Sequence, residues 1–334
     1  MASTSTATAL ELKARQEFSF ARRGLFWALA SGMCWGLDGV VLGVVLASEL
    51  FQDGTLWLLA PLSVAALHDT FASLWLLLSN MLTGRFRELR RTIRSKPVRQ
   101  VALGAIFGGP LGMSAYLLGL KMAGSAYVLP ITSLYPAVAS VLAAFFLKER
   151  VCLRAWIGLL ICIGGGIIIG WTPPTETLGS DFYIGIALAL VATVGWGAEG
   201  VLAASAMDLL DPAVALNIRQ GISSLIYLLL ILPLAGGWSL IIPTLGQLPG
   251  WLTILAAAVG AFSYLCWYRA MNMTGVSRAM ALNITYSLWG IVFSALLLGT
   301  EITSSLVWGA LAIVVGMVLV IGNPMKMTSL RNVQ

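Results

Sequence analysis

Trp35-Gly36-Leu37-Asp38-Gly39-Val40 and Trp196-Gly197-Ala198-Glu199-Gly200-Val201 are two copies of one pattern, 161 positions apart in the chain. In each copy a Trp precedes a carboxylate by three residues, so the two side chains share one face of a helix. Both copies lie in apolar segments, where a carboxylate is costly unless it faces a protein-lined or water-filled interior. The doubled pattern therefore predicts two related membrane-spanning helices that face a functional interior.

The composition of the whole chain agrees with this. Of its 334 residues, 59% are hydrophobic and only 10% are charged, whereas about 25% charged residues is typical of soluble domains. The mean hydropathy is +0.90. These values exclude a soluble globular protein and predict an all-α polytopic membrane protein.

Apolar runs between polar turns give the predicted helices. Nearly all of these runs reach the roughly 17 to 25 residues that a spanning helix needs. We predict ten transmembrane helices, at residues 24–48, 56–82, 98–120, 125–147, 152–171, 182–206, 212–236, 248–271, 275–299 and 303–322.

The polar loop Thr172–Asp181 divides the ten helices into two groups of five, over residues 24–171 and 182–322. Because five is odd, the second half enters the membrane from the opposite side, and the halves form inverted repeats. Many secondary transporters have this architecture, with their site near the midplane where the halves meet. A common offset of 151 positions supports the repeat, and it pairs Tyr116 with Trp267, Tyr135 with Tyr286, and the turn glycines Gly124 and Gly275.

The distribution of basic residues predicts the orientation. With the N-terminus inside, seventeen Lys and Arg residues fall in cytoplasmic segments and only Lys121 falls outside, a strong positive-inside signal. We therefore predict cytoplasmic termini, a mobile N-terminal tail over 1–23, a C-terminal tail over 323–334, and a bacterial inner-membrane location. The net charge of +6 then gives no indication of nucleic acid binding, and the basic run Arg85–Arg99 serves topology or contacts anionic lipids.

No catalytic, metal or cofactor motif is present in the sequence. The chain contains a single histidine, His68, and no GxSxG, Walker or HExxH pattern. The four cysteines lack CxxC or Cys/His spacing and are interpreted as apolar packing residues. We predict that the protein is not an enzyme and holds no cofactor.

Few polar residues lie at membrane depth, and they are the candidates for a site. They are Asp38, His68, Asp69, Glu199, Arg219, Gln220, Arg269 and Asn283. An ion pair between Asp69 and Arg219 would remove most of the cost of two buried charges. Arg269 lies near a helix end and is expected to extend to the interface.

Aromatic side chains accompany these polar residues. Trp35, Trp196, Tyr116, Trp267, Tyr264 and Tyr286 supply enough ring faces for a cage. Ring faces attract cations, and a quaternary ammonium suits a cage because it donates no hydrogen bonds that would stay unsatisfied. The alternative is a position in the interfacial aromatic belts, which we assign instead to Trp27, Trp57, Trp171, Trp251 and Trp308 at helix ends.

At these residues the sequence resembles the drug/metabolite transporter superfamily (EamA type), and within it the Lic-type bacterial choline permeases. The resemblance covers roughly residues 24–322. Its motifs are Trp35-Gly36, Ala66-Leu67-His68-Asp69, Gly109-Pro110-Leu111-Gly112-Met113, Ser133-Leu134-Tyr135-Pro136-Ala137, Phe145-Phe146-Leu147-Lys148, Phe182-Tyr183-Ile184-Gly185, Trp196-Gly197-Ala198-Glu199, Ile218-Arg219-Gln220, Ser263-Tyr264-Leu265 and Asn283-Ile284-Thr285-Tyr286.

The resemblance implies choline uptake, with the ammonium held in an aromatic cage with acidic help. The positions that it implies for substrate binding are Trp35, Trp196, Glu199, Tyr264, Asn283 and Tyr286, with His68 and Asp69 as polar neighbours. The residues themselves add Tyr116, Trp267 and Asp38 to the substrate-binding set, and Arg219 and Gln220 to a polar or coupling network. The choline permeases have no acid at the position of Asp38, so this chain is expected to carry an extra negative charge.

We therefore predict a secondary transporter that imports a small cationic metabolite such as choline by alternating access. Its partners are that metabolite and membrane lipids. Transport is driven by proton coupling or by the membrane potential. The protein is a monomer or homodimer. Three alternatives remain open. They are an efflux transporter for lipophilic cations or amino acids, a permease for a neutral polyol or nucleoside, and a non-transporting membrane scaffold or receptor.

Overall fold

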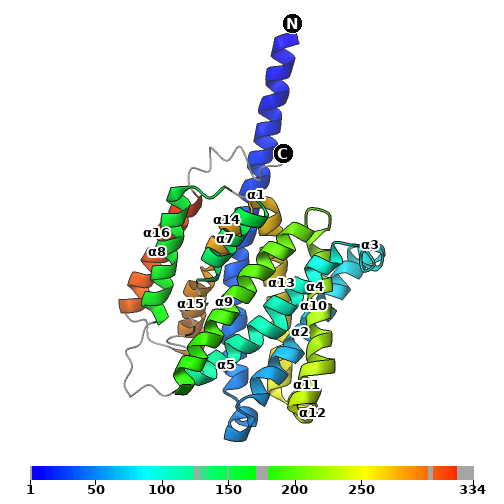
Figure 1. Cartoon of the computed structure of the whole chain (residues 1–334), viewed down its shortest axis with the longest axis vertical. Coiled ribbons are helices and arrows are strands. Elements are labelled where there is room, and N and C mark those ends of the chain that lie inside the picture. The colour runs from blue at the N-terminus through cyan, green and yellow to red at the C-terminus, as the bar shows by residue number, and fades with distance from the viewer. Residues whose placement is uncertain are drawn as a thin grey trace.

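The fold is almost entirely helical (Figure 1). The computed structural model describes residues 2–123, 128, 131–132, 134–148, 150–170, 180–299 and 304–321. Three features predicted from the sequence lie outside these residues: the turn at Gly124, most of the loop 172–181, and the C-terminal tail 323–334.

The described residues of the first half form eight helical elements beside two short 3-10 turns. They are α1 (Ala2–Leu46), α2 (Leu59–Leu82), α3 (Phe86–Thr92), α4 (Val98–Ile106), the π-helix η3 (Phe107–Met113), α5 (Ser114–Ala123), α7 (Tyr135–Phe146) and α8 (Leu153–Gly170). The two turns are η1 (Glu49–Phe51) and η2 (Gly54–Leu56), which connect α1 to α2.

The second half follows the same order of long helices. Its elements are α9 (Ser180–Ala206), α10 (Pro212–Ile226), the π-helix η4 (Tyr227–Ile231), α11 (Leu232–Ala235), α12 (Trp238–Leu245), α13 (Leu248–Thr274), α14 (Val276–Asn283), α15 (Tyr286–Leu298) and α16 (Ser304–Ile321).

Seven segments in the described chain are long and apolar enough to cross a membrane. They are Ser19–Leu46, Leu59–Leu82, Val98–Gly119, Phe182–Ala206, Pro212–Ala235, Leu248–Thr274 and Val276–Leu298. Three shorter apolar helices, Tyr135–Phe146, Leu153–Ile168 and Val307–Val320, occupy the places predicted for the fourth, fifth and tenth spans. The multi-pass helical architecture is therefore present, while the count of ten crossings and the side of each terminus stay predictions.

The N-terminal tail differs from its prediction. Helix α1 begins at Ala2, so residues predicted as a tail over 1–23 continue the first helix, which projects beyond the bundle (Figure 1). The reason lies in the local composition, because the stretch Ala7–Gln16 is rich in Ala, Leu, Glu, Lys and Arg, which are strong helix formers.

The halves pack into each other by exchanging partners. The first helix of one half, α1, packs against α13 and α15 of the other, and α9 packs in the same way against the third helix of the first half and against α7. Helices α1 and α9 run in opposite directions through the bundle (Figure 1). This arrangement is the one expected of inverted repeats, and it places both Trp-Gly patterns at the junction between the halves.

A second junction joins α8 to α16 at one side of the bundle (Figure 1). The contact is close because glycines face each other: a Cβ on Gly158 would lie 2.6 Å from the carbonyl oxygen of Gly316, and one on Gly165 would lie 2.6 Å from that of Gly309. Small residues let membrane helices approach closely. These glycines therefore serve packing.

Candidate functional site

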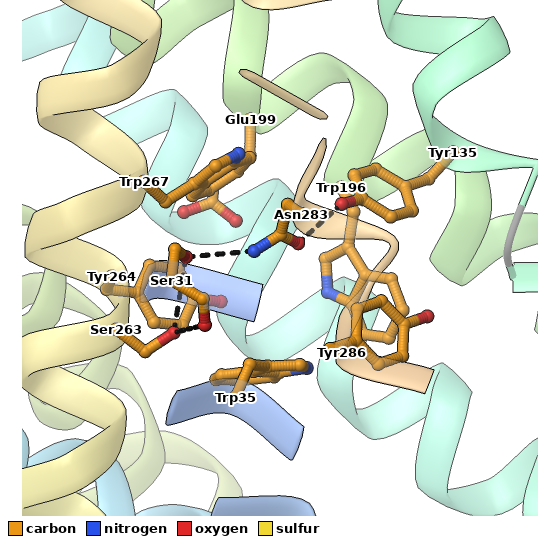
Figure 2. Close-up of a pocket in the computed structure, with 10 residues that line it drawn as sticks. All are labelled: Ser31, Trp35, Tyr135, Trp196, Glu199, Ser263, Tyr264, Trp267, Asn283 and Tyr286. Carbon is orange, nitrogen blue, oxygen red and sulfur yellow. Dashed lines mark hydrogen bonds between the residues drawn. The ribbon is translucent and has the colours of Figure 1, made fainter. Parts of the chain in front are cut away.

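A central pocket lies between the two halves, with about 450 Å³ of atom-free space that includes space open to solvent. Figure 2 shows its side chains converging from both halves of the chain. The lining residues are Ser31, Trp35, Tyr135, Trp196, Glu199, Ser263, Tyr264, Trp267, Asn283 and Tyr286. Six of these ten are aromatic, so the pocket wall consists mainly of rings.

The rings support one another edge to face. Trp35 and Tyr264 have centroids 5.2 Å apart at an interplanar angle of 83°, and Tyr264 meets Trp267 at 5.6 Å and 78°. Tyr135 and Trp196 lie 6.3 Å apart at 87°. Edge-to-face pairs are favourable arrangements of aromatic rings, and they leave ring faces free to turn toward the pocket.

Hydrogen bonds fix the polar side of the pocket. The Asn283 Oδ1 accepts from the Tyr135 hydroxyl at 2.7 Å, and its Nδ2 donates to Ser31 Oγ at 2.8 Å. Ser263 Oγ in turn donates to the Ser31 backbone oxygen at 2.8 Å (Figure 2). Because these groups satisfy each other, the polar wall is organised before any ligand arrives.

Glu199 is held in an ion pair that the sequence did not indicate. The Arg219 Nε lies 2.6 Å from Glu199 Oε1, and its Nη2 lies 3.1 Å from Oε2. Both residues are buried, at 0% and 1% exposure. The predicted pair of Arg219 with Asp69 exists only as a longer contact of 3.8 Å. Glu199 borders the pocket but does not offer it a free carboxylate.

Further charged side chains lie next to Arg219 in a continuous series. Asp69 lies 3.6 Å from His68 Nδ1, and Asp38 Oδ1 lies 3.1 Å from His68 Nε2 on the other side of the ring. Ser223 donates a further hydrogen bond to Asp69. We call Asp38, His68, Asp69, Arg219 and Glu199 the charge chain; all five are buried, and they connect α1, α2, α9 and α10.

The two halves contribute equivalent pairs to this chain. The repeat offsets relate Asp38 to Glu199 and His68 to Arg219, so Asp38–His68 is the counterpart of Glu199–Arg219. The residue at the position equivalent to Asp69 in the other half is Gln220, a neutral residue that accepts a hydrogen bond from Arg219. Asp69 is therefore the acid without an acidic equivalent in the other half.

Glycines on the third helix of each half make room for these pairs. A Cβ on Gly108 would lie 1.6 Å from Glu199 Oε2, and a Cβ on Gly260 would lie 2.7 Å from His68 Nε2 and 3.1 Å from Asp38 Oδ1. Any side chain at either position would displace the charged groups. These two glycines therefore belong to the site, unlike those at the α8–α16 contact.

Pro110 lies inside the π-helix η3, which interrupts the third span. Two of the local carbonyls bond to side chains, with the Gly108 oxygen accepting from Trp196 Nε1 at 3.0 Å and the Gly109 oxygen from the Tyr227 hydroxyl at 3.4 Å. The widened turn thus fixes the ring of Trp196 in the pocket wall.

A second pocket, the vestibule, adjoins the central one and encloses about 900 Å³ of atom-free space, part of it open to the outside. The two share Trp35, Trp196 and Tyr286. The vestibule is lined by Trp35, Asp38, Gly39, Leu42, Gly43, Leu46, Pro61, Val64, Ala65, His68, Asp69, Met113, Tyr116, Leu117, Thr132, Trp196 and Tyr286. It thus extends toward the C-terminal end of α1, the predicted outer side.

The opposite end of the bundle is closed by polar contacts between α2 and α10. Asn80 Nδ2 donates to Asn217 Oδ1 at 3.3 Å and to the Ala213 backbone oxygen at 3.2 Å. Next to them, Arg85 Nε lies 3.5 Å from Asp211 Oδ2. These contacts close the bundle opposite the vestibule, at the end that the charge distribution predicts to be cytoplasmic.

The structure describes all of the predicted substrate-binding and network residues. Seven of the nine predicted substrate-binding residues line the central pocket, while Tyr116 and Asp38 lie in the vestibule, as do the network residues His68 and Asp69. Arg219 and Gln220 are buried behind the pocket, and the Arg269 guanidinium lies over the Trp27 ring at 5.0 Å.

Sequence reasoning missed Ser31, Ser263 and the pocket role of Tyr135. Tyr135 had a signal, because the repeat offset pairs it with Tyr286. The serines had none, since an isolated serine in a membrane helix is too common to single out.

Comparisons with known proteins identify the family. Two stretches, residues 22–171 and 183–322, match the EamA-like transporter family. Protein LicB of Haemophilus influenzae is 29% identical over 82% of this chain and 89% of its own length, and an uncharacterized transporter of Archaeoglobus fulgidus is 25% identical over 79% and 89%. A solved crystal structure, 15% identical, shares the fold with a TM-score of 0.67 over 89% of this chain and 95% of its own. The chain belongs to the EamA-like transporter family.

Proposed function

We propose that this transporter imports a small organic monocation, with choline as the best candidate, through the central pocket by alternating access of its two halves. The observation that carries the proposal is the aromatic pocket beside a buried charge chain whose acids outnumber its bases. Ring faces bind a quaternary ammonium without needing hydrogen bonds from it. We name choline as the candidate cation because the pocket motifs resemble those of the Lic-type permeases.

The formal charge of the chain favours a monocation. Asp38, Asp69 and Glu199 supply three negative charges, and Arg219 supplies one positive charge. Both ring nitrogens of His68 face carboxylate oxygens, which only accept hydrogen bonds, so the imidazolium form satisfies both contacts. One negative charge then remains. A bound monocation balances it, whereas a neutral polyol or nucleoside leaves it uncompensated in a medium that disfavours isolated charge.

Glu199 has a different part from the one that the resemblance implies. Its carboxylate is engaged by Arg219, so it acts on the substrate through the net charge of the chain rather than through a free oxygen. The aromatic faces then carry the direct contacts. Trp35 and Trp196 line both pockets. They are therefore expected to contact the cation as it enters the central pocket and to hold it there.

Uptake of labelled choline into proteoliposomes with an imposed, inside-negative potential tests the proposal. The potential contributes about 2.3 kcal/mol per 100 mV for one positive charge that moves inward, so accumulation should rise steeply with the imposed potential. Trp35→Leu should reduce uptake, and Trp308→Leu, which alters an exposed ring on α16, should not. Absence of choline uptake would overturn the proposal, and export from loaded vesicles without uptake would favour an efflux transporter.

A further inference from the structure

The vestibule differs from the central pocket in its chemistry. Aromatic residues dominate the wall of the central pocket, whereas the vestibule has an apolar wall interrupted by Asp38, His68 and Asp69. Buried acids are expensive in such a wall and mark a function by default. Since the vestibule adjoins the central pocket through shared rings, a solute from this side meets these acids before it reaches the cage.

The charged groups that face the vestibule sum to a negative value. Asp38 and Asp69 are 1% and 7% exposed, and His68 between them is 2% exposed. The nearest further charge is Arg219, 3.8 Å from Asp69, and its guanidinium is already bound to Glu199 on the other side. A positive group is attracted here, and a second carboxylate is repelled with little screening by solvent.

Asp38 is placed to act before the central pocket rather than in it. It lies one helical turn beyond Trp35, on the same face of α1. It lines the vestibule and does not line the central pocket. A substitution there changes the path of approach while the ten residues around the central pocket stay the same.

We propose that the vestibule is a second, outer site for the transported cation, in which Asp38 and Asp69 attract ammonium compounds and reject those that carry an acid group. The proposal rests on the function proposed above and narrows its substrate class to cations without a carboxylate. Two consequences follow. The acids raise the rate at which a cation associates, and they separate choline from glycine betaine, which has the same trimethylammonium head but ends in a carboxylate.

Stopped-flow tryptophan fluorescence and competition binding on the purified protein test both consequences. For the wild type, glycine betaine should compete for labelled choline at least about tenfold less well than choline itself. Asp38→Asn should reduce the ratio of choline to betaine competition strength about fivefold. It should also slow choline association about threefold or more, with the dissociation rate little changed. The matched control is Glu49→Gln, which removes an acid from the same end of α1 outside both pockets.

A second variant keeps the test decisive if Asp38→Asn fails to fold. His68→Gln removes the positive group of the vestibule, so it should act in the opposite direction, speeding choline association and widening the gap to betaine. Equal competition by choline and betaine in the wild type, or an unchanged gap in both folded variants, would overturn the outer site while the central site stands. If choline does not bind the wild-type protein at all, the proposed function falls together with the outer site.

Discussion

The Arg219 guanidinium holds both carboxylate oxygens of Glu199, with Nε 2.6 Å from Oε1 and Nη2 3.1 Å from Oε2. The two residues are twenty positions apart and come from α9 and α10, which follow one another in the chain. Tyr268 adds a hydrogen bond of 3.4 Å to Glu199. The acid that the sequence suggested as a free cation ligand is thus first a structural partner, and its substitution has two effects that experiments must separate.

Stability should report the structural effect. Glu199→Gln leaves the Arg219 guanidinium buried without its carboxylate, and breaking a buried pair costs about 3 kcal/mol or more. We expect Tm in detergent to fall by about 5 °C. The double variant Glu199→Gln with Arg219→Gln should recover more than half of that loss, because both charges of the pair are removed together and Asp69 keeps its contacts with His68 and Ser223. A single variant as stable as the wild type would contradict the importance of this pair.

The glycine that accommodates this pair offers a second prediction. Gly108→Ala would place a methyl group 1.6 Å from Glu199 Oε2, so the ion pair must move, and we expect poor folding or lost choline binding. Gly104→Ala is the matched control, one turn earlier on the same span, where the nearest atom is 3.6 Å from the added Cβ. The two variants should differ sharply in thermal stability and in binding. Equal behaviour would mean that the close approach at Gly108 is not needed.

The aromatic wall should account for most of the binding free energy. Trp196→Leu removes a ring that lines both pockets, and cation–π contacts in desolvated sites contribute about 1 to 2 kcal/mol. We expect choline binding to weaken about five- to thirtyfold, with a smaller loss for Trp196→Tyr, which keeps a ring. Isothermal titration measures both variants. Full choline affinity in the leucine variant would show that the aromatic cage does not bind the cation.

The contacts at the closed end predict which part of the protein must open during alternating access. Asn80 and Asn217 contact each other across α2 and α10, so cysteines at these two positions should cross-link in a background without the four native cysteines. The cross-linked protein should still bind choline from the vestibule and should not transport it. Reductant should restore transport. Uptake by the fully cross-linked protein would show that this end does not have to open.

Much of this architecture follows from hydropathy and repetition. The apolar runs give the helices close to where they lie, because length and hydrophobicity decide which segments can cross a bilayer. The repeated Trp-Gly pattern also brings Trp35 and Trp196 to one pocket, since symmetry places equivalent helices around one axis. The helical start at Ala2 was missed because helix propensity outweighed the Ser and Thr residues near the terminus.

The pairing of the buried charges could not be predicted in the same way. Whether Arg219 meets Asp69 or Glu199 depends on the crossing of α2, α9 and α10, and sequence spacing carries no information about that crossing. The same holds for Gly108 and Gly260, which look like any other membrane glycine until the neighbouring helix is in place. The sequence identified the participants, and only the fold decided their contacts.

The central claim is that the pocket recognises positive charge rather than shape. Choline and 3,3-dimethylbutan-1-ol have nearly the same size and the same hydroxyl group, but the second has a neutral carbon in place of the quaternary nitrogen. Isothermal titration of the purified wild-type protein with each compound tests the claim most directly. We predict that choline binds at least about thirtyfold more tightly than its neutral counterpart. Equal affinity for the two compounds would contradict it.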